Sequence, residues 1–225
     1  MLDGYVKIRF VEFHMKEFFS RYSYRMVKMF VTQAAIGLFG AVLAFAVSGA
    51  GDTVLALTGA FASLFYLFMI YTSAWEIGAA DRISIDSGKL KRRPWIGFII
   101  SLVANIPNLI VATVYGICWA ISHGAEGVAT NIAAMMRVVT LFIEGMYYGL
   151  MAAISIGTRV DLNGNVVPME LFNYWWAYFV IVIPAIVVCG VAYWLGTKNA
   201  KLTTLMDPVY PESDRDHKVK KEKTK

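Results

Sequence analysis

Charged residues are scarce in this sequence of 225 residues. Asp, Glu, Lys and Arg make up 16% of it and hydrophobic residues 58%, whereas ordinary soluble domains have about 25% charged and about 45–50% apolar residues. The mean hydropathy is correspondingly high, at +0.56. Because this apolar excess is too large for the core of a soluble domain, we expect an integral membrane protein.

Residues that carry catalytic or metal-binding chemistry are also few. The three histidines, His14, His123 and His217, are far apart in the sequence, and the two cysteines are Cys118 and Cys189. No H-E-x-x-H, paired-cysteine or G-x-S-x-G spacing occurs, which excludes the enzyme classes that use these motifs. Both cysteines fall within apolar runs, where we expect small buried hydrophobes and no disulfide. We therefore expect neither an enzyme nor a bound metal or cofactor.

What the sequence does contain is long apolar runs. Five stretches of 22 to 27 residues hold almost no charge, and each exceeds the ~20 residues that a helix needs to cross a hydrocarbon core of ~30 Å. Backbone groups in lipid must bond within their own segment, so these lengths predict helices. The predicted fold class is all-α, a multi-pass transmembrane helical bundle with four or five full crossings. The stretches are 29–50, 54–78, 95–121, 132–157 and 171–196.

Tryptophan residues mark the ends of these stretches. All six lie within a few residues of a stretch end, where their amphipathic rings prefer the level of the lipid headgroups. The stretch 132–157 is the exception, because it has no Trp at either end and carries Tyr147 and Tyr148 in its middle. The six residues are Trp75, Trp95, Trp119, Trp175, Trp176 and Trp194.

The distribution of Lys and Arg predicts the orientation of the chain. Residues 1–28 contain six of them and 79–94 contain five, whereas 51–53 and 122–131 contain none. Positively charged loops stay on the cytoplasmic side, so we expect a cell-membrane protein with a cytoplasmic N-terminus. The net charge of +5 and the pI near 9.1 then indicate contact with the anionic lipids of the bilayer and not with nucleic acid.

The path of the stretch 132–157 has two solutions. Five plain crossings would place the C-terminal tail, with its eight Lys and Arg residues, on the outer side. If 132–157 enters and leaves on one side, nineteen of the 21 Lys and Arg residues lie inside, which agrees better with the positive-inside rule. The rule acts mainly near a span, however, and only Lys198, Lys201 and Arg215 of the tail lie within ~15–20 residues of one. Both arrangements stay open.

The sequence divides into three parts. Residues 1–28 form an amphipathic cytosolic segment, 29–196 the transmembrane domain, and 197–225 a basic tail. The last part of this tail lacks apolar periodicity, so we expect it to be disordered.

Two loops carry turn signals. In 79–94, the alternation on either side of Ser87 and Gly88 predicts a short β-hairpin. Further along, Asn163 and Gly164 predict a tight turn in an exposed loop. The loop 79–94 also presents a run of cations that we expect to contact anionic lipid, namely Lys89, Lys91, Arg92 and Arg93.

Small residues recur at steps of three and four in the first two stretches. Such seams let two helices approach closely. Because only residues 51–53 join the two stretches, we expect antiparallel neighbours packed along these seams. The seams are Ala34, Gly37, Ala41, Ala44 and Ser48 in the first stretch, and Ala56, Gly59 and Ser63 in the second.

Helix-breaking and polar residues interrupt the later stretches. Asn105 and Asn108 bracket Pro107, and Pro184 lies at a similar depth in the last stretch. Proline leaves a carbonyl without its helical partner. Two such breaks are typical of transporters that bind solute between broken helices, but they also fit plain kinks in which the asparagines bond neighbouring helices.

A polar face is predicted on the fourth stretch. On a helix, Arg137, Thr140, Glu144, Tyr148 and Ser155 fall near one angle. An ionised side chain in the bilayer costs at least ~2.5 kcal/mol, so Glu144 should face protein or water. Arg137 lies about 10 Å away along the axis, too far for a firm direct pair.

Two functions fit these polar residues. The leading hypothesis is a small transport or channel-type component whose intramembrane site contains Asn105, Asn108, Arg137 and Glu144. The alternative is an accessory or scaffold protein in which the same residues lock the bundle or bind another subunit or a second copy. A path predicts that Glu144 and the asparagines converge on one cavity, whereas a lock predicts that they are dry and mutually satisfied.

Overall fold

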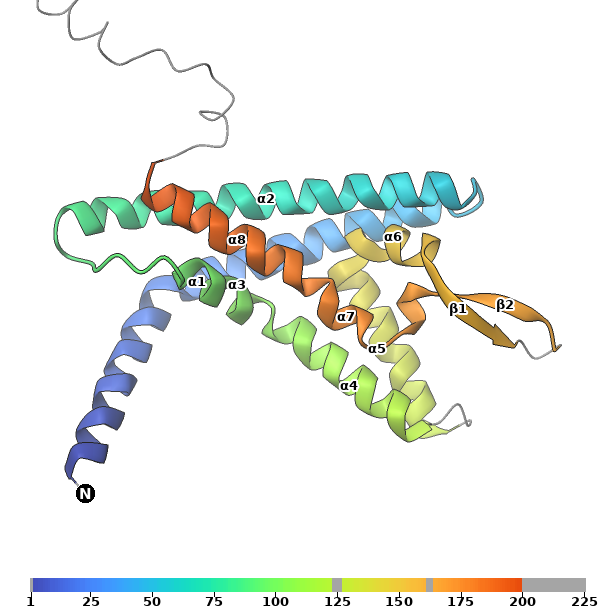
Figure 1. Ribbon diagram of the computed structural model, residues 1–225, viewed down its shortest axis with the longest axis horizontal. Coiled ribbons are helices and arrows are strands. Elements are labelled where there is room, and N and C mark those ends of the chain that lie inside the picture. The colour runs from blue at the N-terminus through green and yellow to red at the C-terminus, as the bar shows by residue number, and fades with distance from the viewer. Residues whose placement is uncertain (1, 123–126, 161–163, 200–225) are drawn as a thin grey trace, which may run out of the picture.

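The computed structural model describes residues 2–122, 127–160 and 164–199. Helices dominate it, and two short strands form one hairpin (Figure 1). The elements are α1 (Leu2–Val47), α2 (Asp52–Asp86), α3 (Ile96–Ala104), α4 (Ile106–Ser122), α5 (Val128–Glu144), η1 (Gly145–Tyr147), α6 (Tyr148–Ala153), β1 (Ser155–Val160), β2 (Val166–Glu170), η2 (Leu171–Asn173), α7 (Ala177–Val180) and α8 (Val182–Thr197).

The helices confirm the predicted all-α fold class. Four helical stretches are long and apolar enough to cross a membrane, and α3 with α4 forms a fifth if this pair, bent by 52°, is one span. The chain is therefore an α-helical membrane protein, with four or five candidate spans among the residues that the structure describes. The four stretches are Lys16–Val47, Asp52–Asp86, Val128–Ala153 and Ala177–Thr197.

Both helix breaks lie just before a proline. The first falls at Asn105, between α3 and α4, and the second at Ile181, between α7 and α8. Pro107 and Pro184 each lack the N–H that would bond to the carbonyl four residues earlier, so the preceding turn is free to bend.

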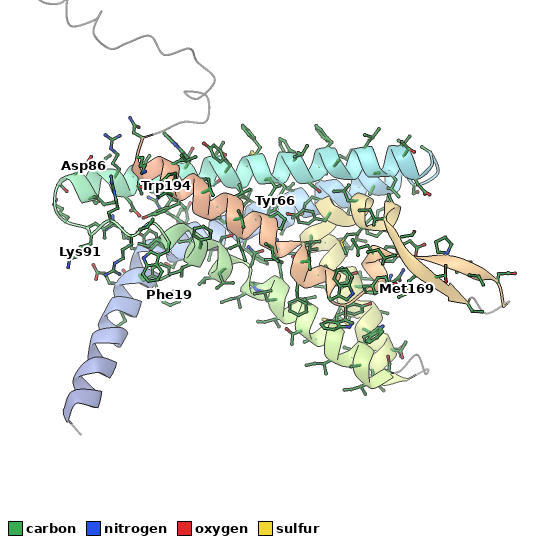
Figure 2. All side chains as sticks on the ribbon, viewed as in Figure 1. Phe19, Tyr66, Asp86, Lys91, Met169 and Trp194 are labelled. Atoms are coloured by element: carbon green, nitrogen blue, oxygen red, sulfur yellow. The ribbon has the colours of Figure 1, made fainter. Side chains whose placement is uncertain are left out.

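Helix α8 packs against both α2 and α3, and the interior of the bundle lies along these contacts. Tyr66 of α2, Ile100 of α3 and Tyr193 of α8 are almost completely buried, and Tyr66 points from α2 into this interior (Figure 2). Glycine brings α2 and α8 unusually close. A Cβ atom at Gly78 would clash with the Tyr193 carbonyl oxygen, and one at Gly196 would clash with the Trp75 carbonyl oxygen.

The small-residue seams of α1 and α2 pack against the fourth stretch, and the prediction that they pack against each other is wrong. Gly37 of α1 abuts the backbone of Phe142 and Ile143, and Gly59 of α2 abuts Gly149 and Leu150. The Ser63 hydroxyl donates a 3.0 Å hydrogen bond to the Met146 carbonyl. Helices α1 and α2 are neighbours, but the seams accept the backbone of α5, η1 and α6.

The β-hairpin predicted in 79–94 is absent from this described stretch, because α2 continues as a helix to Asp86. Gly88, at φ 74°, then turns the chain after the helix. The extra helical turns are held by Asp81, which bonds to side chains of α1 and α8.

A hairpin forms instead after α6. Strands β1 and β2 are antiparallel, with Thr158 opposite Pro168 and Val160 opposite Val166. Ser155 is therefore in a strand and not on the predicted helical face. Gly164 has a φ of 80° in the connection, whereas Asn163 of the predicted turn lies outside the described residues.

The terminal parts are described unequally. Helix α1 runs without a break through the predicted boundary at residues 28 and 29. Disorder was predicted for the last part of the tail. These residues lie outside the described part of the chain, which ends at residue 199.

The connections gather at two ends of the molecule (Figure 1). The α1–α2 turn, the end of α4, the start of α5 and the hairpin lie at one end, which we call the hairpin end. The end of α2, the segment 87–95, the start of α3 and the end of α8 lie at the opposite end, which we call the basic end. Both ends of the stretch Val128–Ala153 therefore lie toward the hairpin end.

Candidate intramembrane site

A cavity of about 270 Å³ lies between α5, α6, η2 and α7. Its walls combine aromatic and aliphatic side chains with a carboxyl group, a guanidinium group and three hydroxyl groups. The residues that line it are Ala134, Arg137, Val138, Thr140, Leu141, Glu144, Tyr148, Met151, Phe172, Tyr178 and Ile181.

Glu144 is the buried acid of this cavity. It is the last residue of α5 and only 4% exposed. Its Oε1 atom has no hydrogen-bond partner among the described residues. The helix tightens into the 3₁₀ turn Gly145–Tyr147 directly after it, and such a turn within a long helix often marks a functional hinge. Gly145 allows this turn to lie against the backbone of Gly37.

Arg137 is the positive group of the cavity. Its guanidinium carbon lies 4.8 Å from the centre of the Phe172 ring, a cation–π distance. The guanidinium is also within hydrogen-bonding reach of Tyr178, whose hydroxyl donates to the Phe172 carbonyl at 2.7 Å. The two ion pairs found in the described part of the chain are Arg21–Asp81 and Arg82–Asp86, so Arg137 and Glu144 are not paired with each other there.

The two predicted asparagines form a chain beside the cavity. The Asn108 amide donates to Asn105 Oδ1 at 2.9 Å, and the Asn105 amide donates to the Ser101 carbonyl at 2.8 Å. Both side chains are buried. Asn108 also lies close enough to the Glu144 carboxyl group to interact with it, while Asn108 Oδ1 has no partner among the described residues.

The structure thus brings together most of the predicted polar residues. Arg137, Thr140, Glu144 and Tyr148 line one cavity. Asn108 of α4 lies beside Glu144, whereas Asn105 bonds to Asn108 and Ser101 and does not line the cavity. Pro107 and Pro184 lie after the two helix breaks and are not among the lining residues.

The predicted lipid-contact residues lie elsewhere, between α2 and α3 at the basic end. Lys89, Lys91, Arg92 and Arg93 are exposed, and Arg92 donates to the Thr197 carbonyl at 3.3 Å. Within the described ranges, no three His, Cys, Asp or Glu side chains gather closely enough to hold a metal ion.

A second polar cluster at the basic end was not predicted from the sequence. Asp81 is 2% exposed and accepts hydrogen bonds from Arg21 at 3.0 Å, Tyr22 at 2.5 Å and Tyr193 at 2.9 Å. These partners join α1, α2 and α8. A sequence signal for it exists, because Asp81 continues the buried stripe of α2 at steps of three and four residues: Tyr66, Ile70, Ala74, Ile77 and Asp81.

Replacing Asp81 by alanine should destabilise the bundle strongly. Removing one partner of a buried ionic group costs about 3 kcal/mol, and here Tyr22 and Tyr193 would also lose an acceptor. Asp86→Ala is the matched control, since its pair with Arg82 is exposed and such pairs contribute at most about 1 kcal/mol. The free energy of unfolding in detergent is measured for both purified variants. Equal losses of stability would show that the Asp81 cluster contributes no more than the exposed ion pair.

Comparison of the chain with known protein families, with curated proteins and with solved structures found no match. The function therefore has to be argued from the site itself.

Proposed function

We propose that this membrane protein is a small transport or channel-type component that takes a polar solute into the cavity between α5, α6 and α7. The observation that supports this most is the state of Glu144. A buried carboxyl group with an unpartnered oxygen faces a cavity inside an apolar segment. Ionisable groups at membrane depth are costly, and those that persist usually belong to substrate or ion pathways.

The composition of the cavity agrees with this proposal. Ligand sites are mostly apolar, with a few polar groups that orient the ligand. Here Glu144 and Arg137 lie seven residues apart on one helix, about 10 Å along its axis, and Tyr148, Phe172 and Tyr178 supply aromatic walls. Such a site suits a small solute that carries both a charged group and an apolar part. The proposal includes no catalytic step.

The proposal predicts that Glu144→Gln impairs solute movement. A hydrogen bond to a charged group contributes about 1.5–3 kcal/mol, so loss of the charge should weaken solute binding roughly tenfold to a hundredfold. The measurement is uptake by proteoliposomes of radiolabelled cations, anions and zwitterions. Glu76→Gln is the matched control, because Glu76 lies on α2 and is exposed. Uptake by the Glu144 variant equal to that of the unmodified protein, or no uptake of any class, would contradict the proposal.

A second function, an accessory or scaffold subunit, is favoured by one observation. Asn108 bonds to Asn105, and Asn105 bonds to Ser101. Neither asparagine is among the residues that line the cavity, as expected if they fix the bend between α3 and α4. This function predicts a stoichiometric membrane partner, or a second copy of the chain, that co-purifies from native membranes in mild detergent.

The orientation belongs to the proposal as well. The basic end carries Lys89, Lys91, Arg92 and Arg93, and by the positive-inside rule we place this end at the cytoplasmic face of a cell membrane, together with the N-terminus.

A further inference from the structure

A separate hollow of about 140 Å³ lies at the basic end, between α1 and the segment that joins α2 to α3. Figure 2 shows Phe19 and Lys91 at this end of the molecule, far from the hairpin. The hollow does not belong to the cavity around Glu144, and it shares none of its residues. Its lining is Glu17, Phe18, Arg21, Tyr22, Lys89, Leu90, Lys91, Arg93 and Ile96.

The rim of this hollow is strongly positive. Four cations surround it, against the single carboxylate of Glu17. Lys89, Lys91 and Arg93 take part in neither of the ion pairs found among the described side chains. Their charges are therefore not neutralised by that part of the protein.

Arg21 is held in a fixed position at the hollow. Its Nε and Nη2 atoms donate to Asp81, and Nη2 also donates to Ser84 at 3.0 Å. None of these bonds uses Nη1. A guanidinium that is fixed on one side presents its remaining donors in a defined direction, which suits recognition of a phosphate group.

The depth of the hollow corresponds to the lipid headgroups. Trp95, which is 64% exposed, directly precedes Ile96 of its lining, and Trp194 lies at the same end of the molecule. Exposed tryptophan rings favour the headgroup level. Phe18, Leu90 and Ile96 give the hollow apolar walls as well, so it can receive a phosphate group together with the start of a hydrocarbon chain.

We propose that this hollow binds the phosphate headgroup of an anionic membrane lipid, with the phosphate between Arg21 and the cations Lys89, Lys91 and Arg93. Basic pockets between membrane helices on the cytoplasmic side bind such headgroups. This site is independent of solute transport, because it uses no residue of the other cavity.

The test is native mass spectrometry of the delipidated protein titrated with phosphatidylglycerol or with phosphatidylcholine. We expect one phosphatidylglycerol to be retained in preference to phosphatidylcholine. The double variant Lys91→Gln/Arg93→Gln should weaken this binding roughly thirtyfold, since each cation near an anionic surface contributes about 1 kcal/mol. Both side chains are exposed, so the variant should fold.

The matched control is Arg25→Gln/Lys28→Gln, which removes the same charge from α1 outside this hollow. An equal loss of lipid in both double variants would overturn the site, because it would indicate general attraction between charges. Retention of lipid by the Lys91/Arg93 variant would overturn it as well. Displacement of the lipid by millimolar inorganic phosphate would assign the hollow to a free anion and overturn the lipid proposal.

Discussion

We expect that replacing Gly78 by alanine will disrupt the packing of α2 on α8. The new Cβ atom would lie less than 3.0 Å from the backbone carbonyl oxygen of Tyr193, a distance that real Cβ atoms essentially never show. A backbone carbonyl cannot rotate away as the end of a side chain can. Overpacking costs about 1–3 kcal/mol, and we expect at least the upper part of this range.

The measurement is the unfolding midpoint of the purified variants in detergent. Gly196→Ala should match Gly78→Ala, because the two glycines face each other across the same crossing. Gly49→Ala is the control, since no atom lies within 4 Å of its added Cβ, and a surface change of this kind alters stability by at most about 0.5 kcal/mol. If Gly78→Ala and Gly49→Ala have the same unfolding midpoint, the Tyr193 carbonyl does not lie against Gly78.

The membrane-spanning helices could be predicted because each depends only on the length and composition of one continuous segment. An apolar run of about 20 residues must be satisfied within its own backbone, and the stretches around residues 29–50 and 54–78 are indeed helical. The helix breaks at Asn105 and Ile181 fall within the turn before Pro107 and Pro184, where the missing N–H acts locally.

The partners of the helices could not be predicted in the same way. A small residue permits close approach, but it does not specify which backbone approaches. Gly37 and Gly59 therefore indicated close packing correctly. The shortness of the connection between their helices, however, led to the wrong prediction that these glycines pack against each other. Their actual neighbours, Gly145 and Gly149, are far away in the sequence.

The residues of the two polar clusters differed in how easily they could be predicted from the sequence. Glu144 and Arg137 stand out because their surroundings in the sequence are apolar. Asp81 is as buried as Glu144, but its neighbours include Arg82, Ser84 and Asp86, so composition alone suggested an exposed loop. Only the helical spacing from Ile77 would have indicated its burial.

We expect that thiol labelling of four single-cysteine variants will decide the membrane topology of the chain. In a background with Cys118→Ala and Cys189→Ala, we expect Val128→Cys and Val166→Cys to react with an impermeant thiol reagent on one face of the membrane. Ser87→Cys and Lys225→Cys should react on the other. The reason is that both ends of the stretch Val128–Ala153 lie toward the hairpin end, whereas α8 ends at the basic end (Figure 1).

Labelling intact and permeabilised cells separates the two arrangements without any assumption about the absolute orientation. If Val128–Ala153 crossed the membrane fully, Val166→Cys would react on the same face as Ser87→Cys, and Lys225→Cys would join Val128→Cys. Val128 and Val166 are 75% and 69% exposed. If either cysteine fails to react from one face, the membrane and not burial in the protein therefore prevents the reaction. Reaction of Val128 and Val166 on one face would mean that the stretch enters and returns, with Glu144 at its 3₁₀ turn and the solute cavity open toward that face.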